Sequence, residues 1–153
     1  MQNESDKQNL KTNKLDPAAR HNARRYLIQA MYEWQLASTP LEDIEYTFLK
    51  TRIDRKCDVD YFKTLLYDIP AQQAVLEQAM EPYLGRLLKE VDPIELAVLY
   101  LGTYELLLRP EIPYRVVLNE ALELVKKFGS VEGYKFINSV LDRVAKKYRV
   151  HEV

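Results

Sequence analysis

The amino-acid sequence predicts an all-α protein, and three observations carry this prediction. Hydrophobic residues occupy 47% of the 153 positions, which is enough apolar material for a buried core. Apolar residues recur at helical rather than strand spacing, as in Leu41, Ile44 and Phe48. The chain has only four glycines, and most of its seven prolines stand where helices would begin or end.

Aspartate–proline pairs mark two of the predicted helix starts. Asp16-Pro17 and Asp92-Pro93 each combine a good N-cap with a proline at the first helical position, where its missing N–H costs nothing. Thr39 before Pro40 predicts a third start, in which Glu42 would complete a capping box. Two more prolines, Pro70 and Pro82, fall within a long apolar-periodic stretch, and each should kink or divide it. The predicted helices span 17–37, 40–51, 59–69, 71–81, 83–90, 93–108, 113–128 and 132–148.

The predicted domain organisation is a short arm followed by one helical domain. Residues 1–15 are polar and lysine-rich, without an apolar period, so we expect a disordered basic arm. Residues 16–150 should form a single all-helical domain. The arm has no apolar signal-peptide core, and Cys57 is the only cysteine, so a reducing, cytoplasmic location is expected.

The same residues argue against several classes of function. Cys57, His21 and His151 are too few and too scattered for a zinc site, so no metal is expected. No nucleophile–base pair or phosphate-cradling glycine loop is evident, which predicts no catalytic residues, no cofactor and no enzyme activity. The longest apolar stretch, 94–108, is too short to cross a bilayer and contains two glutamates, so no membrane partner is expected.

The first predicted helix carries a cluster of basic side chains at its N-terminal end. Arg20 and Arg24 lie one turn apart on the side that becomes apolar further along, and His21 and Arg25 form a second such pair on a neighbouring face. Cations in the first turns of a helix cost roughly 0.3–1 kcal/mol each, because the helix dipole is already positive there. A bound anion would turn this cost into affinity, since free N–H groups and guanidinium forks both bind phosphate.

Two interpretations of this cluster remain open. The first is a local RNA-binding patch on a chain whose net charge is only −1. The second is that the arginines form surface ion pairs with acidic neighbours or simply keep the helix soluble.

A second candidate site opens the last predicted helix, where Tyr134, Lys135 and Asn138 follow two glycines. Aromatic rings, a lysine and an amide suit unpaired bases, which stack on rings and form hydrogen bonds along their edges. The alternative is that Phe136 belongs to the core and Lys135 is merely solvated.

An ordered series of motifs gives the chain a family resemblance. The series begins with Pro17-Ala18-Ala19-Arg20 and Gln29-Ala30-Met31-Tyr32-x-Trp34-Gln35-Leu36. Its most specific block is the last, Lys126-x-Phe128-Gly129 followed by Lys135-Phe136-Ile137-Asn138-x-Val140-Leu141-Asp142. In this order, from about residue 16 to 147, the sequence resembles the NusB family of transcription antitermination factors.

The resemblance implies a compact bundle of about seven helices in two packed sub-bundles. It further implies binding of boxA-type single-stranded RNA together with the ribosomal protein NusE, and loading onto an RNA polymerase antitermination complex, notably in ribosomal RNA operons. Tyr32 and Glu95 lie in matching stretches, and we assign them to the NusE-binding face. Glu95 could instead only cap its helix, and Tyr32 could only border the core.

The arginine-rich motif of the family maps onto Arg20, His21, Asn22 and Arg24. The sequence departs from it here, because His21 and Asn22 stand where family members may carry arginines. Arg25 could then serve as the replacement donor.

A different class of function stays open beside this one. A helical protein-interaction or homodimerisation module, with incidental RNA binding, would have a similar composition. Sedimentation with and without RNA would distinguish the two.

Overall fold

The computed structural model describes residues 16–128 and 130–152. Within these ranges the chain forms seven α-helices and no strand, which confirms the all-α prediction. The helices divide into two compact units, one ending at Asp68 and the other beginning at Ile69. The predicted arm, residues 1–15, lies outside the described residues, and a single domain over 16–150 stays a prediction.

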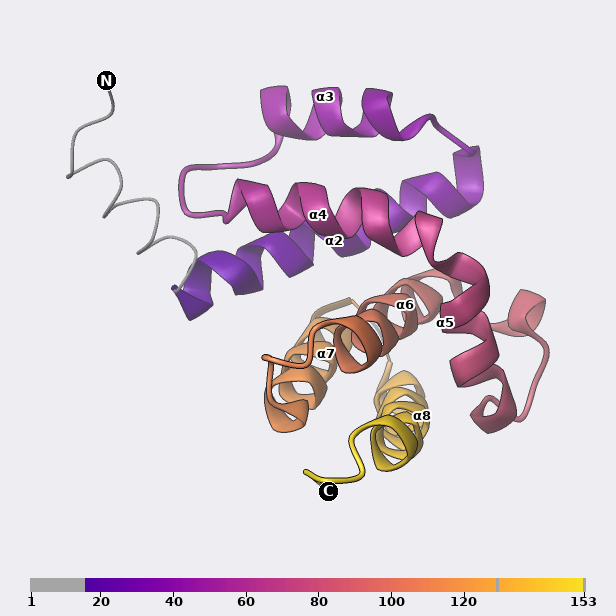
Figure 1. Ribbon diagram of the computed structural model, residues 1–153. Helices are drawn as coiled ribbons and strands as arrows, with labels where there is room; N and C mark the ends of the chain where they lie inside the picture. Colours follow the sequence, from indigo (N-terminus) through magenta and orange to yellow (C-terminus); the bar gives the residue numbers. More distant parts are fainter. Residues whose placement is uncertain (1–15, 129, 153) are drawn as a thin grey trace. The chain divides into compact units, whose positions relative to one another are not determined.

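Unit 1 contains three helices, shown in indigo to magenta in Figure 1: α2 (Pro17–Ala37), α3 (Leu41–Thr51) and α4 (Val59–Ala71), whose last turn enters unit 2. The rings of Phe48 from α3 and Phe62 from α4 stack with centroids 5.6 Å apart, and neither side chain is exposed. Leu27, Ile28 and Met31 of α2 are equally buried, as their helical spacing predicts.

Unit 2 is built around α6, next to α7, α8 and α5 (Figure 1). Its elements are α5 (Gln73–Met80), η1 (Glu81–Tyr83), η2 (Leu88–Glu90), α6 (Pro93–Leu108), α7 (Tyr114–Phe128) and α8 (Val131–Tyr148). Every residue of α6 from Ala97 to Leu106 is buried. No helix among the described residues is long and apolar enough to cross a membrane.

The aspartate caps are confirmed, but the capping box at Thr39 is wrong. Asp16 accepts from the Ala18 N–H at 2.9 Å, and Asp92 accepts from the Ile94 and Glu95 N–H groups. Helix α3 instead begins after Pro40, without a side-chain cap. There the Pro40 carbonyl accepts two backbone N–H groups, so the helix starts without help from Thr39.

The predicted helix over 83–90 is also wrong. Two single-turn 3₁₀ helices, η1 and η2, replace it, with Gly85 between them at φ 66°. That backbone conformation is unfavourable for residues with a Cβ and ends the helical path. The resulting turn matters for the second candidate site, because it places Arg86 there.

Candidate nucleic-acid interface

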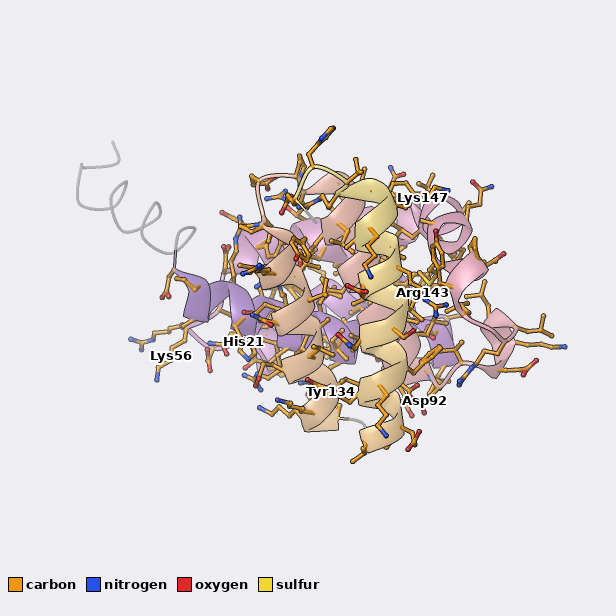
Figure 2. All side chains as sticks on the ribbon, turned by 90° about the horizontal axis from the view of Figure 1, so that it is seen from below. His21, Lys56, Asp92, Tyr134, Arg143 and Lys147 are labelled. Carbon is orange, nitrogen blue, oxygen red and sulfur yellow. The ribbon has the colours of Figure 1, made fainter. Side chains whose placement is uncertain are left out.

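The basic side chains at the start of α2 lie next to the loop that joins α3 to α4. The Asp58 N–H donates to the Ala19 carbonyl at 3.0 Å, and the Asn22 amide donates to the Lys56 carbonyl at 3.1 Å. Figure 2 shows His21 and Lys56 on the same side of unit 1. We call residues 16–25 and 52–58 together the helix-start surface.

Arg20 is held by an aromatic ring and is partly neutralised. Its guanidinium lies 4.2 Å from the centroid of the Tyr61 ring, and its Nε is 3.7 Å from Asp58 Oδ2. The Asp58 side chain is 4% exposed, whereas that of Arg20 keeps 24% exposure. Arg20 is therefore oriented by the protein yet can still reach an anion in solvent.

Arg24 differs from Arg20, because only 3% of it is exposed. Its guanidinium lies 5.6 Å from the same Tyr61 ring, on the inner side of the helix. The projection of α2 placed Arg24 on the apolar stripe, and its burial follows from that position. A direct contact of Arg24 with RNA stays a prediction, whereas packing against Tyr61 is what the structure describes.

Arg25 and His21 occupy the neighbouring face and are both half-buried. The Arg25 guanidinium lies 4.6 Å from the centroid of the Tyr26 ring. Arg25 is also close enough to Cys57 to lower that thiol's pKa, although burial, Asp58 and Asp54 together raise it to about 12. Cys57 is thus an unreactive anchor rather than a nucleophile.

The helix-start surface carries an excess of positive charge. It contains six arginine and lysine side chains against three aspartates, on a chain whose formal net charge is −1. Arg55 and Lys56 are exposed members that the motif analysis did not single out. The basic run Arg52-Ile53-Asp54-Arg55-Lys56 is the signal that could have indicated them.

Unit 2 contains a second candidate site, a groove of about 510 Å³ beside the first turns of α8. Its lining includes Tyr83, Arg86, Glu95, Lys135, Phe136 and Arg143. The Arg86 guanidinium lies 4.1 Å from the centroid of the Phe136 ring. The groove therefore combines three cations and two aromatic side chains, groups that suit phosphates and unpaired bases, with two carboxylates, Glu95 and Glu132.

Glu95 lies in this groove, in contact with the first turn of α8. Its Oε2 would be 2.8 Å from a Cβ added to Gly133, so a larger residue there would require the Glu95 side chain to move. Burial raises the pKa of Glu95 and Asp92 raises it further, whereas Arg86 opposes both effects. The structure therefore places this predicted partner residue in one groove with the predicted RNA residue Lys135.

The other predicted residues of α8 lie beside the groove rather than in it. Tyr134 lines a neighbouring cavity of about 320 Å³ with Lys126, Ser130 and Val131. The Lys126 ammonium lies 5.4 Å from the centroid of the Tyr134 ring. Asn138 is exposed one turn further along α8, on the Tyr134 side. Figure 2 shows Tyr134 near the start of α8, with Arg143 and Lys147 further along the same helix.

Tyr32, the predicted partner residue in unit 1, is exposed. It keeps 40% exposure, and Leu36, one turn later on the same helix, keeps 57%. These two side chains form an apolar strip on the outer face of α2.

Comparison with known proteins places this chain in a family. The model of the NusB family matches residues 21–146. The transcription antitermination protein NusB of Pseudoalteromonas atlantica is 45% identical over 139 residues, covering 91% of this chain and 99% of that protein. The protein of the same name from Idiomarina loihiensis is 47% identical over 135 residues, covering 88% of this chain and 97% of that protein.

Two solved structures share the fold. A NusB from T. maritima superposes with a TM-score of 0.76 at 28% identity, covering 84% of this chain and 91% of that chain. A crystal structure of the antitermination factors NusB and NusE with double-stranded RNA gives 0.78 at 23% identity, covering 87% of this chain and all of that chain, and shows the fold alone. Fold and relatives together define the class of protein as an all-helical transcription antitermination factor. The chain belongs to the NusB family.

Proposed function

We propose that this chain acts in transcription antitermination as a non-catalytic adaptor that binds boxA-type single-stranded RNA together with NusE. Its transcript would be that of a ribosomal RNA operon, and the complex would load onto RNA polymerase in the cytoplasm. The family assignment supports the process, and the two candidate sites support the RNA. The observation that carries the proposal is the excess of cations on the helix-start surface of a nearly neutral chain.

The residues divide into phosphate-binding and base-binding groups. Arg20, His21 and Arg25 would bind phosphates at the start of α2, where free N–H groups and the helix dipole add to the attraction. Arg24 would support them through Tyr61, on which both Arg20 and Arg24 stack.

In unit 2 the cations and the aromatic rings would act together. Lys135 and Arg86 would bind phosphates, while Phe136 and Tyr134 would stack with bases and Asn138 would bind a base edge. The stacking of Arg86 on Phe136 supports this assignment, because a base could replace the guanidinium as the stacking partner of the ring.

NusE would contact Tyr32, Leu36 and Glu95. The exposed apolar strip of α2 favours a protein partner over RNA, since an aromatic ring beside an aliphatic side chain is typical of the buried centre of an interface. A second copy of this chain is the alternative occupant of the strip, in agreement with a homodimerisation module.

We expect removal of two cations from either site to weaken RNA binding by about tenfold to a hundredfold, because each contact is a charge-assisted hydrogen bond. Fluorescence anisotropy with a boxA-type RNA, in the presence of NusE, would measure this for Arg20→Gln/Arg25→Gln and for Arg86→Gln/Lys135→Gln. The matched control is Lys50→Gln/Arg115→Gln, which removes two exposed cations from α3 and α7.

Affinities of both site variants equal to that of the control would contradict the proposal. The same titration includes Tyr32→Ala, which should weaken the complex only when NusE is present. An equal effect without NusE would assign Tyr32 to RNA or to the fold, and sedimentation of the free chain would reveal a homodimer.

A further inference from the structure

The loop between α3 and α4 has an exposed basic pair followed directly by two buried residues. Cys57 and Asp58 are buried, with 5% and 4% exposure, whereas Arg55 and Lys56 are exposed. The buried residues hold the backbone of the loop against unit 1, and this keeps the two basic side chains on the surface.

Four hydrogen bonds fix the shape and place of this loop. Within it, Asp54 Oδ1 accepts from the Lys56 N–H at 2.9 Å, and the Asp54 carbonyl accepts from the Cys57 N–H. Toward α2, the Asp58 N–H donates to the Ala19 carbonyl and the Asn22 amide donates to the Lys56 carbonyl. The loop is thereby attached to the first two turns of α2.

Because the loop is attached to α2, its exposed cations Arg55 and Lys56 lie near the basic side chains at the start of that helix. The Lys56 carbonyl accepts a hydrogen bond from Asn22, whose sequence neighbour is His21, and Figure 2 shows the Lys56 and His21 side chains on the same side of unit 1. Asp58 is occupied by Arg20 and by the first turn of α4, where its Oδ1 accepts from the Tyr61 N–H. Among the described residues of the loop, Asp54 is then the one exposed carboxylate beside Arg55 and Lys56.

We infer that Arg55 and Lys56 form a second phosphate-binding element of the helix-start surface, and that Asn22 is the residue that positions it. The inference rests on the proposed RNA-binding function and adds two contacts to it. A single-stranded RNA that crosses the start of α2 would place successive phosphates against α2 and against the loop. Asn22 itself acts through the loop and touches no phosphate.

The test is the salt dependence of RNA binding, measured with the same RNA and NusE as above. Each phosphate contact contributes about 0.7 to the slope of log affinity against log salt for a single strand, so Arg55→Gln/Lys56→Gln should lower the slope by about 1.4. We expect the affinity to fall about tenfold at low salt. Arg55→Lys/Lys56→Arg keeps both charges and should bind like the unaltered chain.

The control Lys50→Gln/Arg115→Gln removes the same charge elsewhere and should leave the slope unchanged. A loop variant with the slope and affinity of this control would overturn the inference. If Arg20→Gln/Arg25→Gln still weakens binding, only the loop assignment fails; if neither variant weakens it, the proposed function fails as well.

The positioning role of Asn22 needs a separate readout, because Asn22→Ala could simply disturb the fold. We expect Asn22→Ala to weaken RNA binding by the unaltered chain and to have no further effect on the Arg55→Gln/Lys56→Gln variant. Equal weakening in both backgrounds would overturn the positioning role.

Discussion

Replacing Arg149 by alanine is expected to lower the free energy of unfolding by about 3–5 kcal/mol. Its guanidinium is 7% exposed and donates to four backbone carbonyls. Nε donates to the Leu106 carbonyl at 2.8 Å and Nη1 to the Ile112 carbonyl at 2.9 Å. Nη2 donates to the Glu105 and Arg109 carbonyls, both at 3.0 Å. Alanine would remove this donor from all four carbonyls in a largely buried region, although those of Glu105 and Arg109 each also accept a backbone N–H.

The large effect follows because Arg149, which comes directly after α8, places its guanidinium against the C-terminal end of α6. The last carbonyls of a helix have no partners within it, and the helix dipole is negative there, so a buried cation meets both needs. Glu152 completes the arrangement, since it accepts from Arg149 and from the Tyr114 N–H, contacts that lower its pKa.

Urea unfolding followed by circular dichroism would measure the loss. Arg149→Lys should recover only a small part of it, because one ammonium cannot reach four separate carbonyls. The control is Lys146→Ala, which removes an exposed ion pair with Asp142 and should change stability by less than about 1 kcal/mol. Equal stabilities of the Arg149→Ala and Lys146→Ala variants would refute the proposed role of Arg149.

Replacing Phe62 by alanine should cost about 3–5 kcal/mol, and we expect it to affect unit 1 in particular. Phe62 is fully buried and its ring stacks on that of Phe48, which in turn lies 4.6 Å below the Arg52 guanidinium. A cavity here would loosen α3 against α4, and with them the loop that presents Arg55 and Lys56. Weaker RNA binding should therefore accompany the loss of stability.

The control for Phe62 is Tyr46→Ala, an aromatic side chain of α3 that is 63% exposed. It should change stability by less than about 0.5 kcal/mol. Amide hydrogen exchange would show whether the Phe62 variant opens unit 1 before unit 2. Uniform protection at wild-type levels in the α3–α4 region would count against the predicted cavity effect.

Sequence patterns predicted the parts of the fold that depend on neighbours in the chain. Asp16-Pro17 and Asp92-Pro93 begin helices as expected, because a cap needs only the next two or three residues. The prediction of a helix over 83–90 was wrong because the conformation there depends on one backbone angle and not on the apolar pattern. The periodicity of this segment allowed a helix, and the positive φ at Gly85, which divides it into two short turns, is not visible in an apolar pattern.

The candidate site was predictable only where one helix carries it. The basic side chains at the start of α2 lie together because the helical period brings them together. The depth of Arg24 depends on Tyr61, a residue of another helix, so the sequence could not separate it from Arg20. The sequence could not indicate Arg86 for the same reason, because it meets Phe136 only in the folded groove of unit 2. Arg143 lies two turns after Phe136 on α8, so the helical period could have indicated it.

The most direct test of RNA binding by these surfaces is to map cross-links. A boxA-type RNA carrying 4-thiouridine would be irradiated in complex with the chain and NusE, and the cross-linked peptides identified by mass spectrometry. We predict cross-links in 16–25, in 52–58 and in the groove around Lys135 and Phe136. Cross-links confined to the outer faces of α3 and α7, with both candidate sites unlabelled, would contradict the account.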